Sequence, residues 1–402
     1  MSFQQALSGL NAAAKNLDAV SNNVSNVATV GFKGASAQFA DVFGATLTAG
    51  GAGQIGIGVN LAQVKQAFTQ GNISVTNNPL DVAINGGGFF RMSDKGSITY
   101  ARNGQFLVDK EGYIVNANGS RLTGYAADAA GIIVPSSPIE LMIDNSDQVP
   151  NASSEGTLGL NLDSRETTPL PAFSHTNPAS YNSSTAMTVF DSLGNSHILT
   201  LYFRKTGANA WEMRAGLDGA APVTTNNLSF NSAGALTTAM PLTVLSGVNP
   251  GSGANNLTMT LNLSGATQFG AIFGVNAMTQ NGYTSGRLAG LSVSSEGVIQ
   301  GRYSNGKTRN LGQVVLVNFP NPNGLQSLGG NQWTETADSG QPLVGTPNSG
   351  SLGALQSAAV EESNIDLTGE LVNLITAQRN YQANAQSIKA QDAIMQTLVN
   401  LR

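Results

Sequence analysis

The sequence predicts a β-rich, multidomain protein with a long amphipathic helix at each end of the chain. Three observations predict this fold class. Apolar residues recur at helical spacing only near the two termini. The middle of the chain is rich in Gly, Asn, Thr and Ser, with short apolar runs separated by turn residues. With 402 residues, the chain is long enough for two or three domains with cores of their own.

The N-terminal helix is predicted over residues 3–28. Its apolar stripe advances in alternating steps of four and three residues, and only Ser21 interrupts it. Ser2 and Gln5 match a capping box. The helical signal ends where the β-branched Thr29 and Val30 meet a glycine. The residues expected to pack against the other terminus or against neighbouring subunits are Phe3, Leu7, Leu10, Ala14, Leu17 and Val24.

The C-terminal helix is predicted over residues 366–402, about 55 Å at 1.5 Å per residue. Asn364 and Asp366 are candidate N-caps, and Glu370 lies in the first turn, where the helix dipole favours a carboxylate. The expected packing residues are Leu367, Leu371, Leu374, Tyr381, Ile388 and Met395, on a stripe that also holds Ala385 and Val399 and is interrupted by Gln378 and Asp392. Further apolar residues lie off this stripe, namely Ile375, Ile394 and Leu398. The helix is therefore expected to face more than one neighbour.

The termini are expected to be assembly devices. The alternative is a pair of ordinary amphipathic helices packed on one globular domain, and the length, terminal placement and Ala-rich seams of the helices argue against it. Helices with thin seams are marginal in water, so we expect them to be disordered in the monomer and to fold on assembly. Ser21, Gln378 and Asp392 are expected to fix the register of packing at some cost in stability.

Composition excludes several classes of protein. Only 11% of residues are charged and the net charge is -5, so the basic footprint of a nucleic-acid-binding protein is missing. No run of 18 apolar residues predicts a membrane-spanning helix, and no ordinary secretory signal is expected at the N-terminus. The absence of cysteine excludes disulfides and thiolate metal sites. Low charge with 47 glycines is more typical of an extracellular β-rich surface than of a cytoplasmic enzyme.

The middle of the chain reads as a nested pair of β domains. Glycines 44, 50, 51, 53, 56 and 58 favour an extended connection, and the dipeptides Asn103-Gly104, Glu111-Gly112 and Asn118-Gly119 predict hairpin turns. A cluster of prolines from Pro150 to Pro178 marks a new domain. The expected parts are a helical core (1–30 with 364–402), an extended Gly-rich connector (31–70 with 359–363), a first β domain (71–144 with 284–358) and an inserted outer β domain (145–283).

No catalytic, cofactor-binding or metal-ligating residue is predicted. His175 and His197 lie in different segments without metal-ligand spacing, and both are expected to be surface histidines. The glycines before Phe89 and Phe90 lack the ending of a phosphate loop and favour a tight strand connection instead. Residues 191–195 predict a hairpin turn and not a calcium loop. A rival hypothesis, an exported glycoside hydrolase, would use carboxylates such as Asp163 and Glu166, which no motif supports.

Several segments on the two flanks of the chain carry distinctive motifs: residues 16–33 (NLDAVSNNVSNVATVGFK), 80–84, 88–90, 102–106, 323–325 with Trp333, 363–367, 370–372 and 377–384. These segments resemble the bacterial flagellar rod and hook proteins, the axial proteins of the flagellum. They lie in the same order on both flanks of the chain, whereas the middle section resembles the family only loosely. The motif residues matched at the N-terminus include Asn22, Asn23, Asn26, Thr29, Gly31, Phe32 and Lys33.

The resemblance implies a structural subunit and no enzymatic activity or cofactor. Rod proteins of this family lack a large middle insertion, so a chain of this length resembles the hook branch. The implied assembly is a flexible helical tube, a universal joint that transmits torque from rod to filament and encloses an export channel. The terminal helices would form its coiled-coil-like inner layer. The implied partners are other copies of the chain, the distal rod protein, the hook cap, the hook–filament junction proteins and the flagellar type III export apparatus.

The implied location is extracellular, in the flagellar basal body and hook, with no nucleic acid bound and no insertion into a membrane. Two further alternatives remain open: a distal rod protein, which would form a stiff straight tube, and a secreted adhesin with helical anchors.

Overall fold

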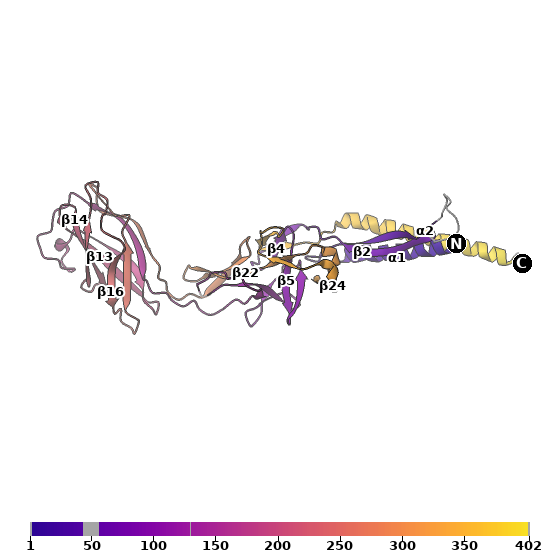
Figure 1. The fold of residues 1–402 in the computed structure, drawn as a ribbon, viewed down its shortest axis with the longest axis horizontal. Helices are drawn as coiled ribbons and strands as arrows, with labels where there is room; N and C mark the ends of the chain where they lie inside the picture. Colours follow the sequence, from indigo (N-terminus) through magenta and orange to yellow (C-terminus); the bar gives the residue numbers. More distant parts are fainter. Residues whose placement is uncertain (1, 43–55, 129, 401–402) are drawn as a thin grey trace. The chain divides into compact units, whose positions relative to one another are not determined.

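One helix lies at each end of the chain, and strands fill the region between them (Figure 1). The computed structural model describes residues 2–42, 56–128 and 130–400. The predicted fold class is confirmed. The chain divides into two compact units, which we call unit 1 (Met1–Asp144, Gly290–Arg302 and Thr308–Arg402) and unit 2 (Asn145–Ala289 and Tyr303–Lys307). The four-part organisation expected from the sequence stays a prediction.

Helix α1 is slightly shorter than predicted, and α2 begins one residue later than predicted. Helix α1 spans Ser2–Ser25 and helix α2 spans Leu367–Asn400. Residues 26–29 form turns instead of a last helical turn, as the bond from Thr29 N to Asn26 O shows (3.1 Å). Neither helix is long and apolar enough to cross a membrane within the described part of the chain. The side chains of Ser2, Leu398 and Val399, named in the predicted cap and apolar surface, lie outside the description.

Helix α2 begins where the sequence predicts an N-cap. The Asp366 carboxylate accepts hydrogen bonds from the backbone N–H of Thr368 (3.1 Å) and Gly369 (3.3 Å), donors that the first helical turn leaves open. The prediction that Asn364 is also an N-cap was wrong. Its side chain bonds the backbone of Gly34 instead, and this contact belongs to the site described below.

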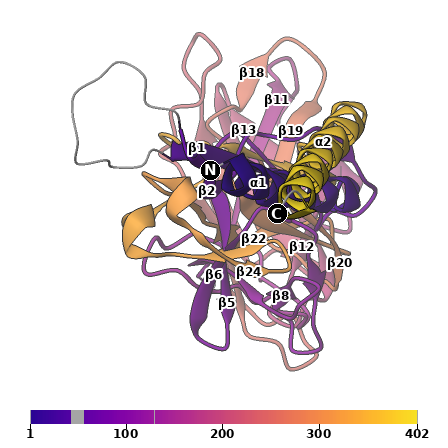
Figure 2. The same ribbon diagram turned by 90° about the vertical axis from the view of Figure 1, so that its right-hand side faces the viewer.

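The two helices lie side by side in the chain (Figure 2). Ala6 and Val20 of α1 and Ala377 of α2 are buried, and a Cβ at Gly9 would come within 2.9 Å of the Asn384 side chain, so the helices approach closely there. The expectation that both helices are disordered in the free monomer stays a prediction.

A β-hairpin lies within the segment expected to be an extended connector. Strand β1 (Ala35–Val42) pairs antiparallel with β2 (Gly58–Gln66). The hairpin is tied to α1 by a bond from Gln5 Nε2 to Gly56 O (2.6 Å). Sequence analysis missed this pairing because both strands are largely exposed and show little apolar alternation. Four glycines cited for the connector (44, 50, 51 and 53) lie outside the described residues.

The remaining strands before unit 2 and those after it form one large sheet, in which neighbouring strands are often not consecutive in the chain, and two small sheets. The large sheet follows the order β20-β21-β22-β9-β5-β6-β25-β24, with β7, β8, β10, β23 and β26 attached, while β27 pairs with β4 and β28 with β3. The strands before unit 2 are β3 (Ile73–Val75), β4 (Val82–Asn85), β5 (Phe89–Asp94), β6 (Ser97–Ala101), β7 (Leu107–Val108), β8 (Ile114–Val115), β9 (Arg121–Ala126) and β10 (Ile139–Glu140). Those after it are β20 (Leu288–Val293), β21 (Val298–Tyr303), β22 (Thr308–Val314), β23 (Leu316–Asn318), β24 (Gln326–Gly329), β25 (Gln332–Thr334), β26 (Leu343–Gly345), β27 (Ala354–Ser357) and β28 (Ala359–Glu361), with short 3₁₀ turns at Pro322–Gly324 and Ala337–Ser339.

The core of this sheet is aromatic. Phe89 and Phe90 are buried, as predicted, because Gly86 and Gly88 take positive φ angles of 120° and 115° and turn the chain tightly before them. The predicted apolar run 314–317 is also buried, although it is divided between β22 and β23. The rings that share the core meet edge to face, an arrangement that aromatic quadrupoles favour.

Gly104 was predicted to be the turn residue of a hairpin, and this was wrong. Its φ is not positive, unlike those of Gly112 (92°) and Gly119 (82°), which are turn residues as predicted. Gly104 is instead required for close backbone approach, because a Cβ there would lie 1.7 Å from the carbonyl oxygen of Val82.

Gly104→Ala is therefore expected to destabilise unit 1 by about 1–3 kcal/mol or more, because the backbone must separate to admit the methyl group. Chemical denaturation followed by Trp333 fluorescence measures the effect. Gly290→Ala is the matched control, since the nearest atom to a Cβ there is the flexible end of Arg302 at 3.6 Å. Equal unfolding midpoints for the two variants would contradict the assigned role.

Unit 2 consists of two sheets that share one apolar core. A five-stranded sheet follows the order β16-β17-β11-β18, with β19 paired to β11, and a four-stranded sheet follows β12-β13-β14-β15. The core includes Leu158 and Leu160 from the first sheet and Leu199, Phe203 and Trp211 from the second. The strands are β11 (Glu155–Asp163), β12 (Ser183–Phe190), β13 (Ser196–Gly207), β14 (Ala210–Leu217), β15 (Thr224–Ser229), β16 (Leu242–Val248), β17 (Leu257–Asn262), β18 (Thr267–Phe269) and β19 (Gly274–Gln280), with a 3₁₀ turn at Pro178–Ser180.

Candidate functional site

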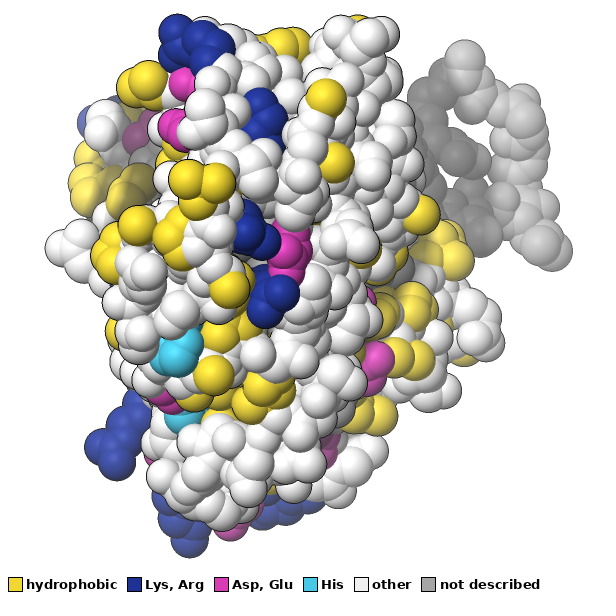
Figure 3. All heavy atoms as spheres, turned by 90° about the vertical axis from the view of Figure 1, so that its left-hand side faces the viewer, with side chains coloured by type: hydrophobic (Ala, Val, Ile, Leu, Met, Phe, Trp, Pro, Cys, Tyr) yellow, Lys and Arg dark blue, Asp and Glu magenta, His cyan; other side chains and the backbone are white. Residues whose placement is uncertain are grey.

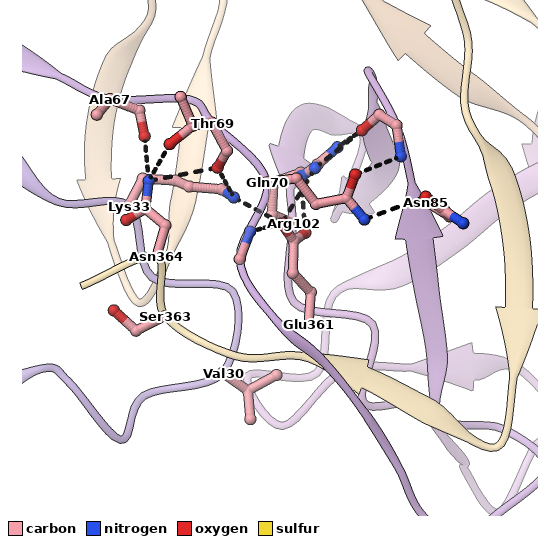
Figure 4. A network of polar contacts seen from close by, with 12 residues as sticks. Val30, Lys33, Ala67, Thr69, Gln70, Asn85, Arg102, Glu361, Ser363 and Asn364 are labelled. Atoms are coloured by element: carbon pink, nitrogen blue, oxygen red, sulfur yellow. Dashed lines mark hydrogen bonds and ion pairs between the residues drawn. The ribbon is translucent and has the colours of Figure 1, made fainter. Parts of the chain in front are cut away.

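Three buried charged side chains meet where the terminal segments join the β-sheets of unit 1 (Figure 4). We call Lys33, Arg102 and Glu361 the junction cluster. Lys33 follows α1, Arg102 follows β6, and Glu361 ends β28 shortly before α2. The cluster therefore connects both chain termini to the sheet.

Glu361 is the centre of the junction cluster. Its Oε1 accepts from Lys33 Nζ (2.7 Å), from the backbone N–H of Gly71 (2.9 Å) and from Arg102 Nη2 (3.2 Å). Its Oε2 forms an ion pair with Arg102 Nε (2.9 Å). The side chains of Lys33 and Glu361 are 0% exposed and that of Arg102 is 4% exposed. Such a carboxylate is stable in the interior only because its charge is paired and hydrogen-bonded.

The cluster holds two cations and one carboxylate, and backbone carbonyls accept further hydrogen bonds from both cations. Lys33 Nζ donates to Thr69 O (2.7 Å), while Arg102 Nη1 donates to Gly86 O (3.0 Å) and Gly88 O (2.5 Å). Burial, followed by the nearby charge of Arg102, lowers the pKa of Lys33, and Glu361 acts in the opposite direction. Without Glu361, the charged form of Lys33 would lose its main stabilising partner.

Two asparagines tie the helix ends to the hairpin beside the cluster. Asn23 donates from Nδ2 to Ala35 O (2.8 Å) and to Glu370 Oε1 (2.6 Å), and its Oδ1 accepts from Ala35 N (2.9 Å). Asn364 donates to Ala67 O (2.7 Å) and accepts from Gly34 N (2.9 Å). Each amide thus satisfies one backbone donor and one backbone acceptor, as strand pairing would.

The structure places the N-terminal motif residues in two groups. Asn23, Gly31 and Lys33 contact the C-terminal segment: Gly31 N donates to Glu361 O (2.7 Å), and a Cβ at Gly31 would lie 2.6 Å from Asn103 N. The second group closes the turn after α1 and makes only local bonds. It consists of Asn22, Asn26, Thr29 and Phe32.

The residues predicted to pack along the helices are only partly covered within one chain. Leu10, Ala14, Leu17, Val24, Leu374 and Ile388 are half-buried. Phe3, Leu7, Leu367, Leu371, Tyr381 and Met395 are exposed. Their role in packing between copies stays a prediction.

Arg102 and Glu361 were not selected as site residues from the sequence. Arg102 stands at the start of the motif segment 102–106, which is the one signal that could have found it. Glu361 ends a short apolar run, and no local pattern distinguishes it from a surface glutamate.

The described residues offer little chemistry of other kinds. They contain no group of three His, Asp or Glu side chains that could hold a metal ion. Asp163 is bonded by Arg165, whose side-chain and backbone hydrogen bonds lower the pKa of Asp163 to about 2. A general acid requires the opposite shift. His197 is not the plain surface histidine that was predicted, because its ring lies between two carboxylates.

Comparison with known proteins agrees with the arrangement of termini and β units. Four family models match: "Flagella basal body rod protein" at residues 3–33, "Flagellar hook protein FlgE/F/G D1 domain" at 83–150, "Flagellar basal body protein FlaE D2 domain" at 161–283 and "Flagellar basal body rod FlgEFG protein C-terminal" at 356–401. The crystal structure of Helicobacter pylori flagellar hook protein FlgE2 has a similar fold, with a TM-score of 0.53 over 72% of this chain and 100% of that chain at 14% identity.

Curated relatives match along their full length. The chain is 43% identical to flagellar hook protein FlgE of Escherichia coli K12 and 41% identical to that of Salmonella typhimurium, covering 100% of each chain in both comparisons. The chain therefore belongs to the flagellar hook protein family, whose members are structural subunits of an extracellular appendage and not enzymes.

Proposed function

We propose that this hook subunit polymerises through its terminal helices into a flexible helical tube that transmits torque from rod to filament and encloses an export channel. The residues assigned to packing between copies are the exposed members of the predicted stripes, with Phe3 and Leu7 on α1 and Leu367, Leu371, Tyr381 and Met395 on α2. The half-buried members of the same stripes would complete these contacts.

One observation carries the proposal: α2 keeps large apolar side chains exposed although α1 already packs along it. Val372, Ile375, Ile394 and Met395 are 49–62% exposed. A cavity of about 450 Å³ also remains among α1, α2 and the start of the hairpin, lined by Val20, Ile365 and Ala377 among others. An apolar surface of this kind is typical of a helix that binds further helices.

The further partners are proposed from the family resemblance. The proposed partners are the distal rod protein at one end of the tube, and the hook cap and the hook–filament junction proteins at the other end. The flagellar type III export apparatus would export the subunit. Support comes from the termini, since residues 3–33 and 356–401 match models described as basal body rod proteins. Subunits with similar terminal helices could stack in one continuous inner layer.

The double substitution Val372→Ser with Ile375→Ser is expected to raise the critical concentration for polymerisation more than tenfold. Removing two apolar side chains from a helix contact costs about 2–4 kcal/mol, and each 1.4 kcal/mol is a factor of ten. Sedimentation of the purified chain measures the critical concentration, and electron microscopy shows whether the polymers are tubes.

The matched control is Asn380→Ser with Ala383→Ser, which has the same spacing on exposed positions of α2 but removes no large apolar group. It is expected to assemble like the unaltered chain. Assembly of the Val372 and Ile375 variant at the unaltered concentration would reject this contact. Straight, stiff tubes would instead favour a rod-like role.

A further inference from the structure

His197 occupies an unusual position in unit 2, because its ring bridges two carboxylates from different segments. Nδ1 lies 2.6 Å from Asp218 Oδ2, and Nε2 lies 3.3 Å from Asp191 Oδ2. Asp191 belongs to the β12–β13 turn and is 0% exposed, and Asp218 directly follows β14 and is 48% exposed. The histidine side chain is 11% exposed.

Neither neutral form of the ring fits this position. A neutral imidazole has one N–H donor and one lone pair. With the proton on Nδ1, the lone pair of Nε2 would face the Asp191 oxygen; with the proton on Nε2, a lone pair would face Asp218 at 2.6 Å. Only the doubly protonated ring donates to both carboxylates. The geometry therefore selects the imidazolium ion.

Among the described residues, the cross-strand partner of His197 and the loop beside the turn bring no charged side chain to the ring. Opposite His197 on β12 stands Val189. Ser192 in the turn accepts from Asn255 N, in a loop (249–256) that contains no ionisable residue. Figure 3 shows histidine side chains (cyan) at the surface, with hydrophobic side chains and an acidic group (magenta) beside them. Asp191 and Asp218 are thus the charged groups that act on the ring.

The turn joined by His197 packs where the chain enters and leaves unit 2. A Cβ at Gly194 would lie 2.9 Å from Pro150 and 3.3 Å from Ser285 N. These residues flank the bridges that pair the incoming segment with the outgoing one, Gln148 with Gly286 and Asn151 with Tyr283. A change in the turn would act directly on this pair of segments.

We propose that His197 is a charged clasp that holds the β12–β13 turn to the end of β14, and that loss of its proton as the pH rises releases the turn beside the incoming and outgoing segments. The clasp is a pH-sensitive device within unit 2, and it does not depend on the proposed assembly through the terminal helices.

The direction of each pKa agrees with this geometry. Burial lowers the pKa of His197, but hydrogen bonds and charges from Asp218 and Asp191 outweigh burial, so the pKa is raised above its usual 6.5. The pKa of Asp191 is lowered to about 2 despite burial, because Asn195 and His197 bond its carboxylate, and the pKa of Asp218 is also lowered.

The sign of the pH dependence follows from these shifts. The His197 contribution to stability is complete below pH 6.5 and is lost as the pH rises through the raised pKa of the folded state. The carboxylates contribute above about pH 4, and their contribution is lost as the pH falls. The clasp is therefore fully closed in mildly acidic solution.

Nuclear magnetic resonance of the full chain labelled with ¹⁵N-histidine tests the clasp directly. The chain has two histidines, so His175→Gln assigns the signals without touching the clasp. Both ring nitrogens of His197 are expected to be protonated at pH 6, with a titration midpoint above the usual 6.5. A neutral His197 ring with one protonated nitrogen at pH 6, or a midpoint at or below 6.5, would overturn the proposal.

The second measurement is unfolding of unit 2, followed by Trp211 fluorescence at pH 6 and pH 9. The unaltered chain and His175→Gln are expected to lose stability between the two values, and His197→Gln is expected to lose most of this difference. The same loss in His197→Gln as in the unaltered chain would overturn the proposal. If the variant fails to fold, the ring titration of the unaltered chain decides.

Discussion

Replacing Glu361 with glutamine is expected to destabilise unit 1 by about 3–5 kcal/mol, because it leaves two buried cations without their shared carboxylate. The substitution keeps the shape and one acceptor of the side chain but removes its charge. The carbonyls of Thr69, Gly86 and Gly88 still accept hydrogen bonds. They are dipoles and not charges, so they cannot replace the ion pair.

The pH dependence of this variant adds a second, independent signature. Lys33 already has a lowered pKa, and loss of Glu361 removes the partner that opposes this shift. The lysine is therefore expected to lose its proton at a lower pH in the variant. Since a neutral Lys33 no longer needs a counter-charge, the deficit in stability should shrink as the pH rises from 7 to 10.

Denaturation followed by Trp333 fluorescence measures both effects. Glu362→Gln is the matched control: it removes the same charge one residue away, where the side chain is exposed and bonds only Asn72 at 3.3 Å in the described structure. Its effect is expected to stay within about 0.5 kcal/mol. Similar midpoints for the two variants would show that the junction cluster is not the stabilising element inferred from its burial.

Deleting residues 1–28 is expected to abolish polymerisation while leaving a folded, monomeric β protein. The deletion removes α1 but retains Gly31 and Lys33, so the junction cluster and both β units keep their contacts. It removes the exposed Phe3 and Leu7, together with the helix that packs on α2. A lone α2 is marginal in water, because most helical stability comes from packing.

Sedimentation and electron microscopy report assembly of the truncated chain, and its two tryptophans report the fold. Trp211 lies in the core of unit 2 and Trp333 in the aromatic core of unit 1, so each unit has its own probe. Native-like emission from both, without polymers, is the expected result. Tubes formed by the truncated chain at the rate and concentration of the full chain would reject the assembly role of α1.

Sequence reasoning was most successful where the signal is local. The helix periodicity located both terminal helices to within a few residues, and the carboxylate of Asp366 caps α2 as predicted. The hairpin turn at 191–195 follows from side-chain chemistry alone, since Asp191 bonds the backbone of Leu193 and Asn195. Each of these features depends on residues within a few positions of one another.

The features that sequence reasoning missed depend on distant residues. Lys33 and Glu361 are 328 positions apart, and Arg102 and Glu361 are 259 apart, so no local pattern could pair them. The Ala-rich seams of α1 and α2 were recognised from the sequence, but the residues that meet across them were not. A Cβ at Gly9 would come within 2.9 Å of the Asn384 side chain, and these two residues lie at opposite ends of the chain.

The paired segments at the base of unit 2 have a consequence for protein engineering. Gln148 bridges Gly286 and Asn151 bridges Tyr283, so this insertion leaves and rejoins its host chain at adjacent points. Exchange of such an insertion does not require the host to stretch, which is why grafts succeed at sites of this kind. An unrelated domain whose N- and C-termini lie close together could replace the residues between 147 and 287. Each chimeric chain would then carry the inserted domain at a defined position.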